Sequence, residues 1–395
     1  MDATATGGFL RFFSDLPDPR TGNHITHQLH DLLIIALFAV ICGADGWVEV
    51  QLWGRCKYKW LATFLELPGG IPSHDTFGRV FALLDPASLE RCFVAWMAAV
   101  VELSNGTLVS IDGKALRRSF EHGWDKSGMS YLLSAFVSQG DNRLVFSQMA
   151  VEDKENEIVA IPRLLELLDL KGAVVTIDAI GCQREIAGKI VEAGADYILP
   201  VKDNQPALHA KVESLMNDLV LDHDQKIAGT SVSYCEQSEQ GHGRLETRRV
   251  WASDDISSLG KELLDQWPGL SGIAKVQRTR QDLGDFSGKV SIECCFYILS
   301  LKGGAEGNAS ADAAEVAAYI RGHWSVENNL HWQLDVSFRE DDNRIRKGNG
   351  AENYSRLCRI ALNLLKRDKS VKSGIKGKRL NAGWDNDYLL RLINQ

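Results

Sequence analysis

Two short apolar runs that each end at an aspartate constrain the fold of this chain more than any other feature. They are LVSIDG at residues 108–113 and VVTIDA at residues 174–179. A buried strand that ends in an acid presents the carboxylate at the carboxyl edge of a sheet, where the sites of α/β proteins gather. Asp112 and Asp178 are therefore predicted site residues. The alternatives are a plain Asp-Gly turn for Asp112 and a helix cap for Asp178.

The segments around these runs predict a mixed sheet flanked by helices, since strand patterns are followed by strand–helix alternation. Gln139–Arg143 is the expected hairpin turn between two of the strands. The further strands predicted are 131–137, 143–150 and 197–201, and the helices are 157–168 and 184–193.

The remaining segments suggest further domains. We expect a helical N-terminal domain at 1–100, a core at 101–206 and 305–370, a mainly β insertion at 207–304, and a tail at 371–395. In the first of these, Ser73 or Asp75 caps a helix that Pro86 ends. The insertion has strands at 231–237, 244–251, 273–279 and 290–301, with Leu283–Lys289 connecting the last two; helices follow at 311–334 and 351–366.

A third acid, Glu327, lies in RGHWSVENNLHWQLDVSFREDDNRIR at residues 321–346. His323, Glu327 and His331 fall at helical spacing on one face. This face could hold zinc, because histidine suits zinc. Together with Asp112 and Asp178, however, Glu327 favours an oxygen-rich Mg²⁺ or Mn²⁺ site, with the histidines lining a bound polyanion.

The net charge of −8 argues against a general polyanion binder, but the charge is unevenly distributed. Between Asn343 and Leu380 there are twelve Lys or Arg and two Asp or Glu, a local balance of +10. This predicts a basic C-terminal face for a specific polyanion site. The longest apolar run, Leu32–Ile41, is too short to span a bilayer. We therefore expect no membrane association.

Basic and polar residues near the three acids are the candidates for polyanion contact, because they can bond to phosphate oxygens. Trp324 and Trp332 are interpreted as core anchors, with base stacking as the alternative. The candidate contact residues are Lys114, Arg117, Arg118, Lys202, Asn204, Gln205, Arg321, His323, Asn328, His331, Arg344, Arg346 and Lys347.

The motifs resemble those of the H-repeat-associated (ISAs-type) DDE transposases of bacterial insertion sequences. In the wider group, the third-acid helix carries an arginine where this chain has His323 and a lysine where it has Leu334. Arg339, Arg344, Arg346 or Lys347 are the candidates to replace them. The motifs that carry the resemblance are GIPSHDTFGRVFALLD, IDGKALRRS, KENEI, TIDAIGCQ, YILPVKDNQPAL, HGRLETRRVW and the segment at 321–346.

The resemblance implies a ribonuclease-H-like core in which Asp112, Asp178 and Glu327 hold two Mg²⁺ or Mn²⁺ ions. It implies cleavage and joining of double-stranded DNA, at the terminal inverted repeats of the element and in target DNA. A homodimer is expected because two DNA ends must be paired. The expected location is the bacterial cytoplasm, with nucleoid association when active. The alternatives are a non-catalytic DNA-binding relic or regulator and a metal-dependent nuclease without joining activity.

Overall fold

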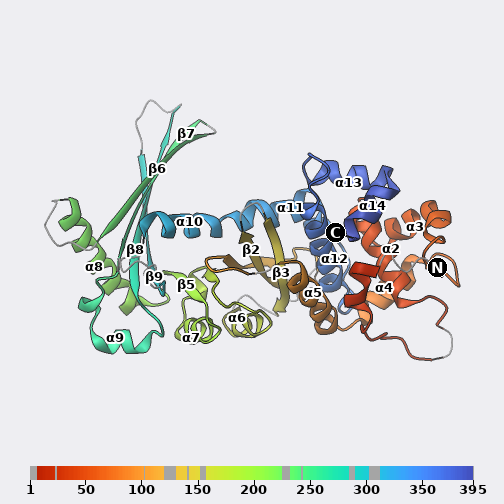
Figure 1. Cartoon of the computed structure of the whole chain (residues 1–395), viewed down its shortest axis with the longest axis horizontal. Helices are drawn as coiled ribbons and strands as arrows, with labels where there is room; N and C mark the ends of the chain where they lie inside the picture. The colour runs from red at the N-terminus through yellow and green to blue at the C-terminus, as the bar shows by residue number, and fades with distance from the viewer. Residues whose placement is uncertain are drawn as a thin grey trace. The chain divides into compact units, whose positions relative to one another are not determined.

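The computed structural model describes residues 7–22, 25–101, 103–119, 130–139, 142–151, 157–224, 232–241, 243–283, 290–301 and 312–394 (Figure 1). The chain divides into two compact units. Unit 1 consists of Met1–Glu102, Asp112–Ala160 and Val326–Gln395, and unit 2 consists of Leu103–Ile111 and Ile161–Ser325. Because unit 1 combines three stretches of the sequence, residues that are far apart along the chain meet in it.

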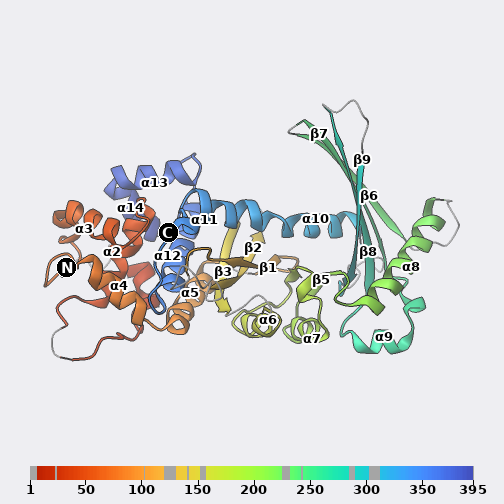
Figure 2. The same cartoon turned by 180° about the vertical axis from the view of Figure 1, so that it is seen from behind.

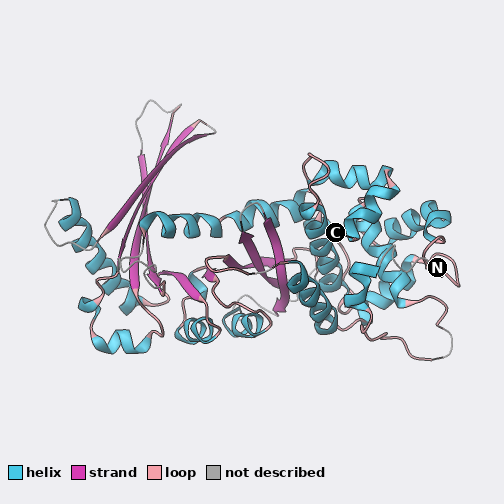
Figure 3. Ribbon diagram, viewed as in Figure 1, coloured by secondary structure: helices cyan, strands magenta, loops and turns pink. Residues whose placement is uncertain are grey.

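The helices of unit 1 pack around α12 (Gly350–Arg367), which is buried along most of its length (Figure 3). Its neighbours come from both ends of the chain, and the segment predicted as a C-terminal tail supplies two of them, α13 and α14. The other helical elements at the two ends of unit 1 are α1 (Gly7–Leu10), η1 (Arg11–Phe13), α2 (Leu29–Ile41), α3 (Trp47–Leu61), α4 (His74–Leu83), α5 (Pro86–Val100), α13 (Ile375–Trp384) and α14 (Asn386–Ile393).

Two helices of the N-terminal segment begin directly after residues whose side chains cap them. The Ser73 hydroxyl accepts a hydrogen bond from the Thr76 N–H and caps α4, as predicted. Pro86 has another role than expected: α4 ends at Leu83, and Pro86 is in the first turn of α5, which Asp85 caps. Proline suits that position because a first-turn N–H has no helical partner.

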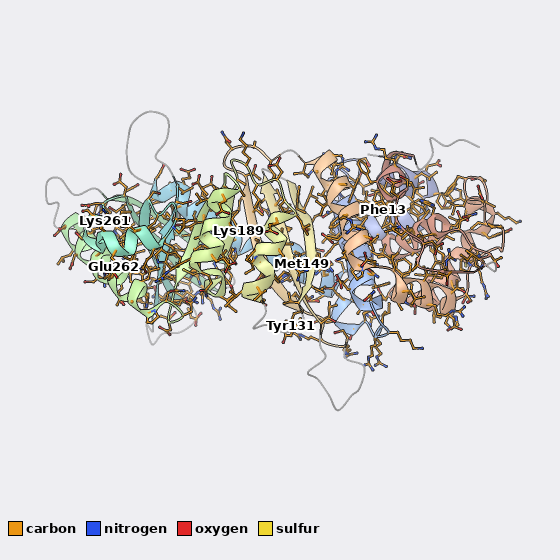
Figure 4. All side chains as sticks on the ribbon, turned by 90° about the horizontal axis from the view of Figure 1, so that it is seen from below. Phe13, Tyr131, Met149, Lys189, Lys261 and Glu262 are labelled. Atoms are coloured by element: carbon orange, nitrogen blue, oxygen red, sulfur yellow. The ribbon has the colours of Figure 1, made fainter. Side chains whose placement is uncertain are left out.

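Unit 1 also contains an antiparallel hairpin of β2 (Tyr131–Gln139) and β3 (Asn142–Val151). Tyr131 pairs with Val151 and Leu133 pairs with Met149; Tyr131 and Met149 are labelled in Figure 4. Helices α5 and α12 pack against β3, which buries one side of the hairpin. The two strands were predicted, but the middle of the predicted turn at 139–143 lies outside the described residues.

The sheet of unit 2 has the strand order β1-β4-β5-β9-β8-β7-β6 (Figure 2). The pairs β1–β4 and β4–β5 are parallel, and the remaining pairs are antiparallel. The sheet is therefore mixed, as predicted. The strands are β1 (Leu108–Ala115), β4 (Val174–Ile177), β5 (Asp196–Val201), β6 (Ser233–Gly241), β7 (Arg244–Ser253), β8 (Gly272–Asp282) and β9 (Val290–Leu299).

The four strands of the predicted insertion extend this sheet, because β9 pairs with β5. Three helical elements accompany them: α8 (Pro206–Asp224), η5 (Ser257–Leu259) and α9 (Lys261–Gln266). Lys261 and Glu262 at the start of α9 are labelled in Figure 4. Most of the predicted connection at 283–289 lies outside the described residues.

Helices cover both faces of the unit 2 sheet. Helix α10 (Ala313–His323) packs its apolar side, including Val316 and Ile320, on residues of β4, β5, β7, β8 and β9. Helix α7 (Arg184–Glu192), which carries the labelled Lys189, packs on β5 from the other face (Figure 1; Figure 4). Burial of apolar side chains between these layers is the main stabilising contribution. Helix α6 (Glu157–Glu166) precedes β4.

The predicted single helix at 311–334 is interrupted. Helix α10 ends at His323, a π-helical turn η6 (Glu327–His331) follows, and α11 (Trp332–Val336) completes the segment before the short η7 (Glu340–Asp342). Among the described residues, no helix has the length and apolar character needed to cross a bilayer.

Candidate functional site

The described pairing of β1 with β4 ends at the residue before each predicted aspartate. In unit 2 these strands are parallel, and Ile111 pairs with Ile177. Asp112 is the residue after Ile111, and Asp178 is the residue after Ile177. Adjacent parallel strands run in the same direction, so residues at matching positions approach the same sheet edge.

Asp112 lies within β1, whereas the sequence predicted that the strand ends at this acid. The strand continues to Ala115, beyond the last residue that pairs with β4. The Asp112 side chain is half-buried, with 20% exposed. At the next residue, a Cβ on Gly113 would lie 2.6 Å from Oε1 of Glu157. A larger residue there would displace the Glu157 side chain.

In unit 1 the carboxylates of Asp112 and Glu327 converge with the imidazole of His331. The Nδ1 atom of His331 lies 3.6 Å from Oδ2 of Asp112 and 3.6 Å from Oε2 of Glu327. One ligand atom from each residue lies within 4.8 Å of the others, so the three form a candidate metal site, here named the acid–histidine cluster. Carboxylate oxygens are the preferred ligands of hard divalent cations, so the cluster fits such an ion.

Glu327 and His331 are the first and last residues of the π-helical turn η6. The backbone N–H of Trp332 donates to the carbonyl of Glu327, which closes the wider turn. Turns of this type are rare and occur frequently at functional sites. The helical spacing in the sequence did predict that Glu327 and His331 share a face, but it gave no sign of the wider turn.

Lys366 of α12 holds this turn in place, and the sequence analysis did not identify it. Its amine donates hydrogen bonds to the backbone carbonyls of Asn329 (2.6 Å) and Arg143 (2.7 Å). Arg143 also donates to the side-chain oxygen of Asn329, at 3.3 Å. Burial lowers the pKa of Lys366 to about 7, and the charge of Arg143 contributes to the decrease. A lysine on the last turn of a predicted amphipathic helix was the only available signal.

A second group of carboxylates, here named the charge-paired cluster, surrounds Lys114. The Lys114 amine pairs with Asp335, Glu340 and Asp341. Arg359, fully buried, donates to Oε1 of Glu340 at 2.8 Å. Burial raises the pKa of Glu340, but Arg359 and Lys114 outweigh it and lower the value to about 2. Lys114 was a candidate for polyanion contact, and only 9% of its side chain is exposed.

Arg117 and Arg118, which follow in the sequence, are more accessible. The Arg117 side chain is 76% exposed and its Nε lies 3.3 Å from Asp341. The Arg118 side chain is 43% exposed and lies 3.3 Å from Asp342. Nε of Arg346, another candidate, donates to the backbone carbonyl of Arg118 at 3.0 Å. Exposed ion pairs of this kind are weak, so phosphate oxygens can replace the carboxylates.

Asp178 lies in unit 2, where it caps the short turn η4 (Ala179–Gly181). The helix-cap alternative therefore describes its local hydrogen bonding. Two of the candidate contact residues hold the loop: the Asn204 amide donates to a carbonyl of the turn at 2.7 Å, and the Gln205 amide donates to the carbonyl of Cys182 at 3.1 Å. These amides position the loop after Asp178. Lys202, before them, is exposed.

The three residues of the helical face proposed for zinc are divided between the two units, with His323 in unit 2 and Glu327 and His331 in unit 1. His323 is the last residue of α10, and its Nδ1 lies 3.0 Å from the Thr176 hydroxyl in unit 2. The π-helical turn changes the spacing after that point, and the third member of the acid–histidine cluster is Asp112. Arg321 is exposed and pairs with Glu239 at 2.5 Å, and Asn328 is exposed.

The basic stretch at 343–380 forms less of a surface than the sequence predicted. Four of its cations are buried and bonded within unit 1, which corrects the expectation of a continuous basic face: Arg356, Arg359, Lys378 and Arg379. A count of charged residues does not show which of their side chains are buried. Arg344 and Lys347 remain exposed, and they line a pocket of about 1090 Å³ in unit 1 together with Arg79 and His74.

The two tryptophans of the third-acid segment are not core anchors, contrary to expectation. Trp324 is 54% exposed and Trp332 is 52% exposed. The guanidinium of Arg278 lies 5.8 Å from the ring centre of Trp324. The expectation failed because it rested on residue type, whereas exposure depends on the packing around each ring. Exposed rings leave the base-stacking alternative open for both residues.

Fold and site together define an α/β protein with a mixed sheet, flanking helices and a candidate divalent-metal site. The family model described as "Transposase DDE domain" matches residues 104–364. A second model, described as "DDE_Tnp_1-associated", matches residues 10–97. The chain belongs to the DDE transposase family.

The chain is similar over nearly its whole length to proteins of Escherichia coli. It is 39% identical to "Putative transposase YncI" of strain O157:H7 over 97% of this chain and 94% of that protein. It is 36% identical to "H repeat-associated putative transposase YhhI" of strain K12 over 97% of each chain. A solved piggyBac transposase synaptic complex with hairpin DNA matches at 9% identity and a TM-score of 0.38, over 98% of this chain and 78% of that one. A likeness of this size supports no statement about function.

Proposed function

We propose that this protein is a metal-dependent DNA transposase that cuts the ends of an insertion sequence and joins them to target DNA. Asp112, Asp178 and Glu327 are the proposed catalytic and metal-binding residues. The observation that carries the proposal is the convergence of Asp112 and Glu327 on one point, from segments more than two hundred residues apart. Membership of the DDE transposase family gives this convergence its chemical meaning.

Asp178 joins this site in the proposal because of the strand register. It follows Ile177, whose partner Ile111 precedes Asp112. The amides of Asn204 and Gln205 hold the loop after Asp178, which fixes the backbone from which its carboxylate projects. In the proposed site, three carboxylates around one point would repel one another unless cations lie between them.

The proposed cofactors are two divalent cations, Mg²⁺ or Mn²⁺. When bound, such ions activate the attacking oxygen and stabilise the leaving oxygen of a phosphodiester. The protein contributes the three carboxylates that hold them. Lys366 keeps the π-helical turn in the conformation that directs Glu327 towards Asp112. The chain therefore supplies positioning, and no covalent protein intermediate is required.

The proposed DNA contacts fall into two groups by accessibility. Arg117 and Arg118 lie close to Asp112 in sequence and can reach phosphate oxygens from exposed positions. Lys114, Asn204 and Gln205 are engaged within the protein and are proposed to act by positioning. The remaining proposed DNA-binding residues are Lys202, Arg321, His323, Asn328, His331, Arg344, Arg346 and Lys347.

The proposal also covers the domains of the chain, its oligomeric state and its location. The core is proposed to be ribonuclease-H-like, formed by residues 101–206 and 305–370, with a mainly β insertion at 207–304 and an N-terminal domain at 1–100 that binds DNA ends. The active complex is proposed to be a homodimer on double-stranded DNA, associated with the bacterial nucleoid. The mixed sheet and the strands β6–β9 support the core and the insertion.

The test is a cleavage assay on double-stranded DNA that carries the inverted repeats flanking the gene, with Mg²⁺ or Mn²⁺ and a pre-cleaved 3′-hydroxyl end for strand transfer. Asp112→Asn, Asp178→Asn and Glu327→Gln should each reduce cleavage by more than about 100-fold, beyond the effect typical of residues around a metal site. DNA binding and folding should persist.

Asp203→Asn is the matched control, since Asp203 is an exposed acid on the loop that follows β5. It should cleave at the wild-type rate. Cleavage that survives any of the three catalytic substitutions would remove that residue from the site. DNA binding by the wild type without cleavage would instead favour a non-catalytic regulator, and cleavage without joining would favour a simple nuclease.

A further inference from the structure

We propose that His331 is itself a metal ligand through Nδ1, and that this nitrogen makes the acid–histidine cluster select Mn²⁺ over Mg²⁺. The inference rests on the proposed function for the location of the ion. It replaces the DNA contact proposed for His331, whose side chain is buried, with a role in holding the cation, and it states which cation the site prefers. The convergence of Nδ1 with the two carboxylate oxygens carries it.

The burial of His331 separates it from an ordinary surface histidine. Its side chain is only 8% exposed, and Nδ1 is directed towards Asp112 and Glu327. The other ring nitrogen, Nε2, is buried and has no hydrogen-bond partner among the described residues. Buried polar atoms are usually hydrogen-bonded. The ring therefore differs from a core histidine whose two nitrogens are both hydrogen-bonded. Its Nδ1 atom faces two carboxylates.

The distances fit a shared cation better than direct hydrogen bonds. Both separations from Nδ1 are 3.6 Å, which is longer than a hydrogen bond to a carboxylate oxygen. Ligand-to-metal distances of ~2.1 Å place neighbouring ligand atoms ~3.0–3.4 Å apart. The observed separations need to shorten by only a few tenths of an ångström, which side-chain rotation can supply.

The π-helical turn explains how the helix supplies two ligands to one ion. Glu327 and His331 are four residues apart, at the two ends of η6. Their side chains point to the same place, and Asp112 approaches from β1. The hydrogen bond from Lys366 to the carbonyl of Asn329 fixes the middle of the turn. The two ligands are therefore preorganised by backbone contacts that do not depend on the metal.

The selectivity follows from the donor set. Mg²⁺ prefers oxygen ligands and retains several waters, whereas divalent transition metals accept imidazole nitrogen more readily. Mn²⁺ combines this tolerance with a preference for carboxylates. A site that adds one imidazole to its carboxylates should therefore bind Mn²⁺ more tightly than Mg²⁺. Replacing the nitrogen by a further carboxylate should reduce that difference.

The experiment uses the full chain with Mn²⁺ as the probe and no DNA. Pulsed electron paramagnetic resonance on the bound Mn²⁺ should show nitrogen modulation that changes when histidine is labelled with ¹⁵N. His331→Asp should retain Mn²⁺ but lose the modulation, and competition with Mg²⁺ should show a fall of about tenfold in Mn²⁺ preference. His323→Asn should keep the modulation, because His323 belongs to α10 and contacts Thr176.

His331→Asn is a second variant in case the buried carboxylate of His331→Asp prevents folding, and circular dichroism checks both. Modulation that persists in either folded variant, or its absence from Mn²⁺ bound to the wild type, would overturn the ligand assignment. A different result would contradict the proposed function: Asp112→Asn would bind Mn²⁺ as tightly as the wild type. If Asp112→Asn abolishes Mn²⁺ binding but the wild-type spectrum has no nitrogen modulation, the proposed metal site is supported and His331 is not one of its ligands.

Discussion

The acid–histidine cluster and the charge-paired cluster both gather carboxylates in unit 1, but they balance the charge in different ways. In the charge-paired cluster, the buried cations Lys114 and Arg359 contact the acids directly. In the acid–histidine cluster, the group that faces both carboxylates is an imidazole, which carries a charge only when it is protonated. The first arrangement places cations of the protein beside its carboxylates, and the second suits an added cation.

The two clusters begin from neighbouring residues on one strand. Asp112 and Lys114 are two positions apart in β1, so their side chains project from the same side of the strand. Asp112 contributes to the acid–histidine cluster, and Lys114 contributes to the charge-paired cluster. The comparison suggests that Lys114 anchors the segment that follows η6 beside the proposed metal ligands.

The largest effect on stability is expected for Glu340→Gln. This change leaves the buried guanidinium of Arg359 without its carboxylate, and breaking a buried ion pair typically costs about 3–5 kcal/mol. Urea denaturation should show the decrease in the free energy of unfolding. Asp112→Asn is the matched change in the other cluster, and it should cost less than about 1 kcal/mol because it removes a repulsive charge. Equal losses in the two variants would contradict the comparison.

The same pair of variants should differ in their response to acid. Because the pKa of Glu340 in the folded protein is lowered from 4.5 to about 2, its ionised form stabilises the fold above pH 4.5. That contribution should be lost as the pH falls from 4.5 towards 2. Glu340→Gln should remove this part of the acid dependence, and Asp112→Asn should retain it, as measured by urea denaturation at several pH values.

A smaller effect is expected when metal is added. Saturating Mn²⁺ or Mg²⁺ should stabilise the wild type by about 2.7 kcal/mol at one hundred times the dissociation constant. Thermal melting should show the increase in Tm, and a chelator should reverse it. Asp112→Asn should abolish the increase, whereas Glu340→Gln should retain it relative to its own metal-free Tm. An unchanged wild-type Tm at millimolar metal would count against the proposed metal site.

The smallest effect is expected for Lys366→Met, which removes two hydrogen bonds to backbone carbonyls at similar side-chain size. The π-helical turn should become less ordered, so that affinity for Mn²⁺ falls by about tenfold, equal to about 1.4 kcal/mol. Calorimetric titration measures this change. Lys369→Met is the control, since Lys369 is exposed shortly after the same helix. An identical affinity in the two variants would show that Lys366 does not support the turn.

Much of the fold was predictable because it depends on local sequence patterns. The runs before Asp112 and Asp178 gave β1 and β4, and alternation predicted β6 to β9. Ser73 was recognised as a cap because its side chain bonds within its own helix. The interruption of the helix at Glu327–His331 was not predictable, since the turn depends on contacts with distant segments such as the hydrogen bond from Lys366 to the carbonyl of Asn329.

The sequence by itself determined the three acids, their order along the chain and the types of element that carry them, because these features depend on short patterns of apolar and polar residues. Only the tertiary structure decided how each charge is balanced. Lys114 and Glu340 are more than two hundred residues apart, yet they meet and neutralise each other. His331 faces Asp112 instead of solvent. Electrostatic interaction depends on distance in space, which local sequence does not specify.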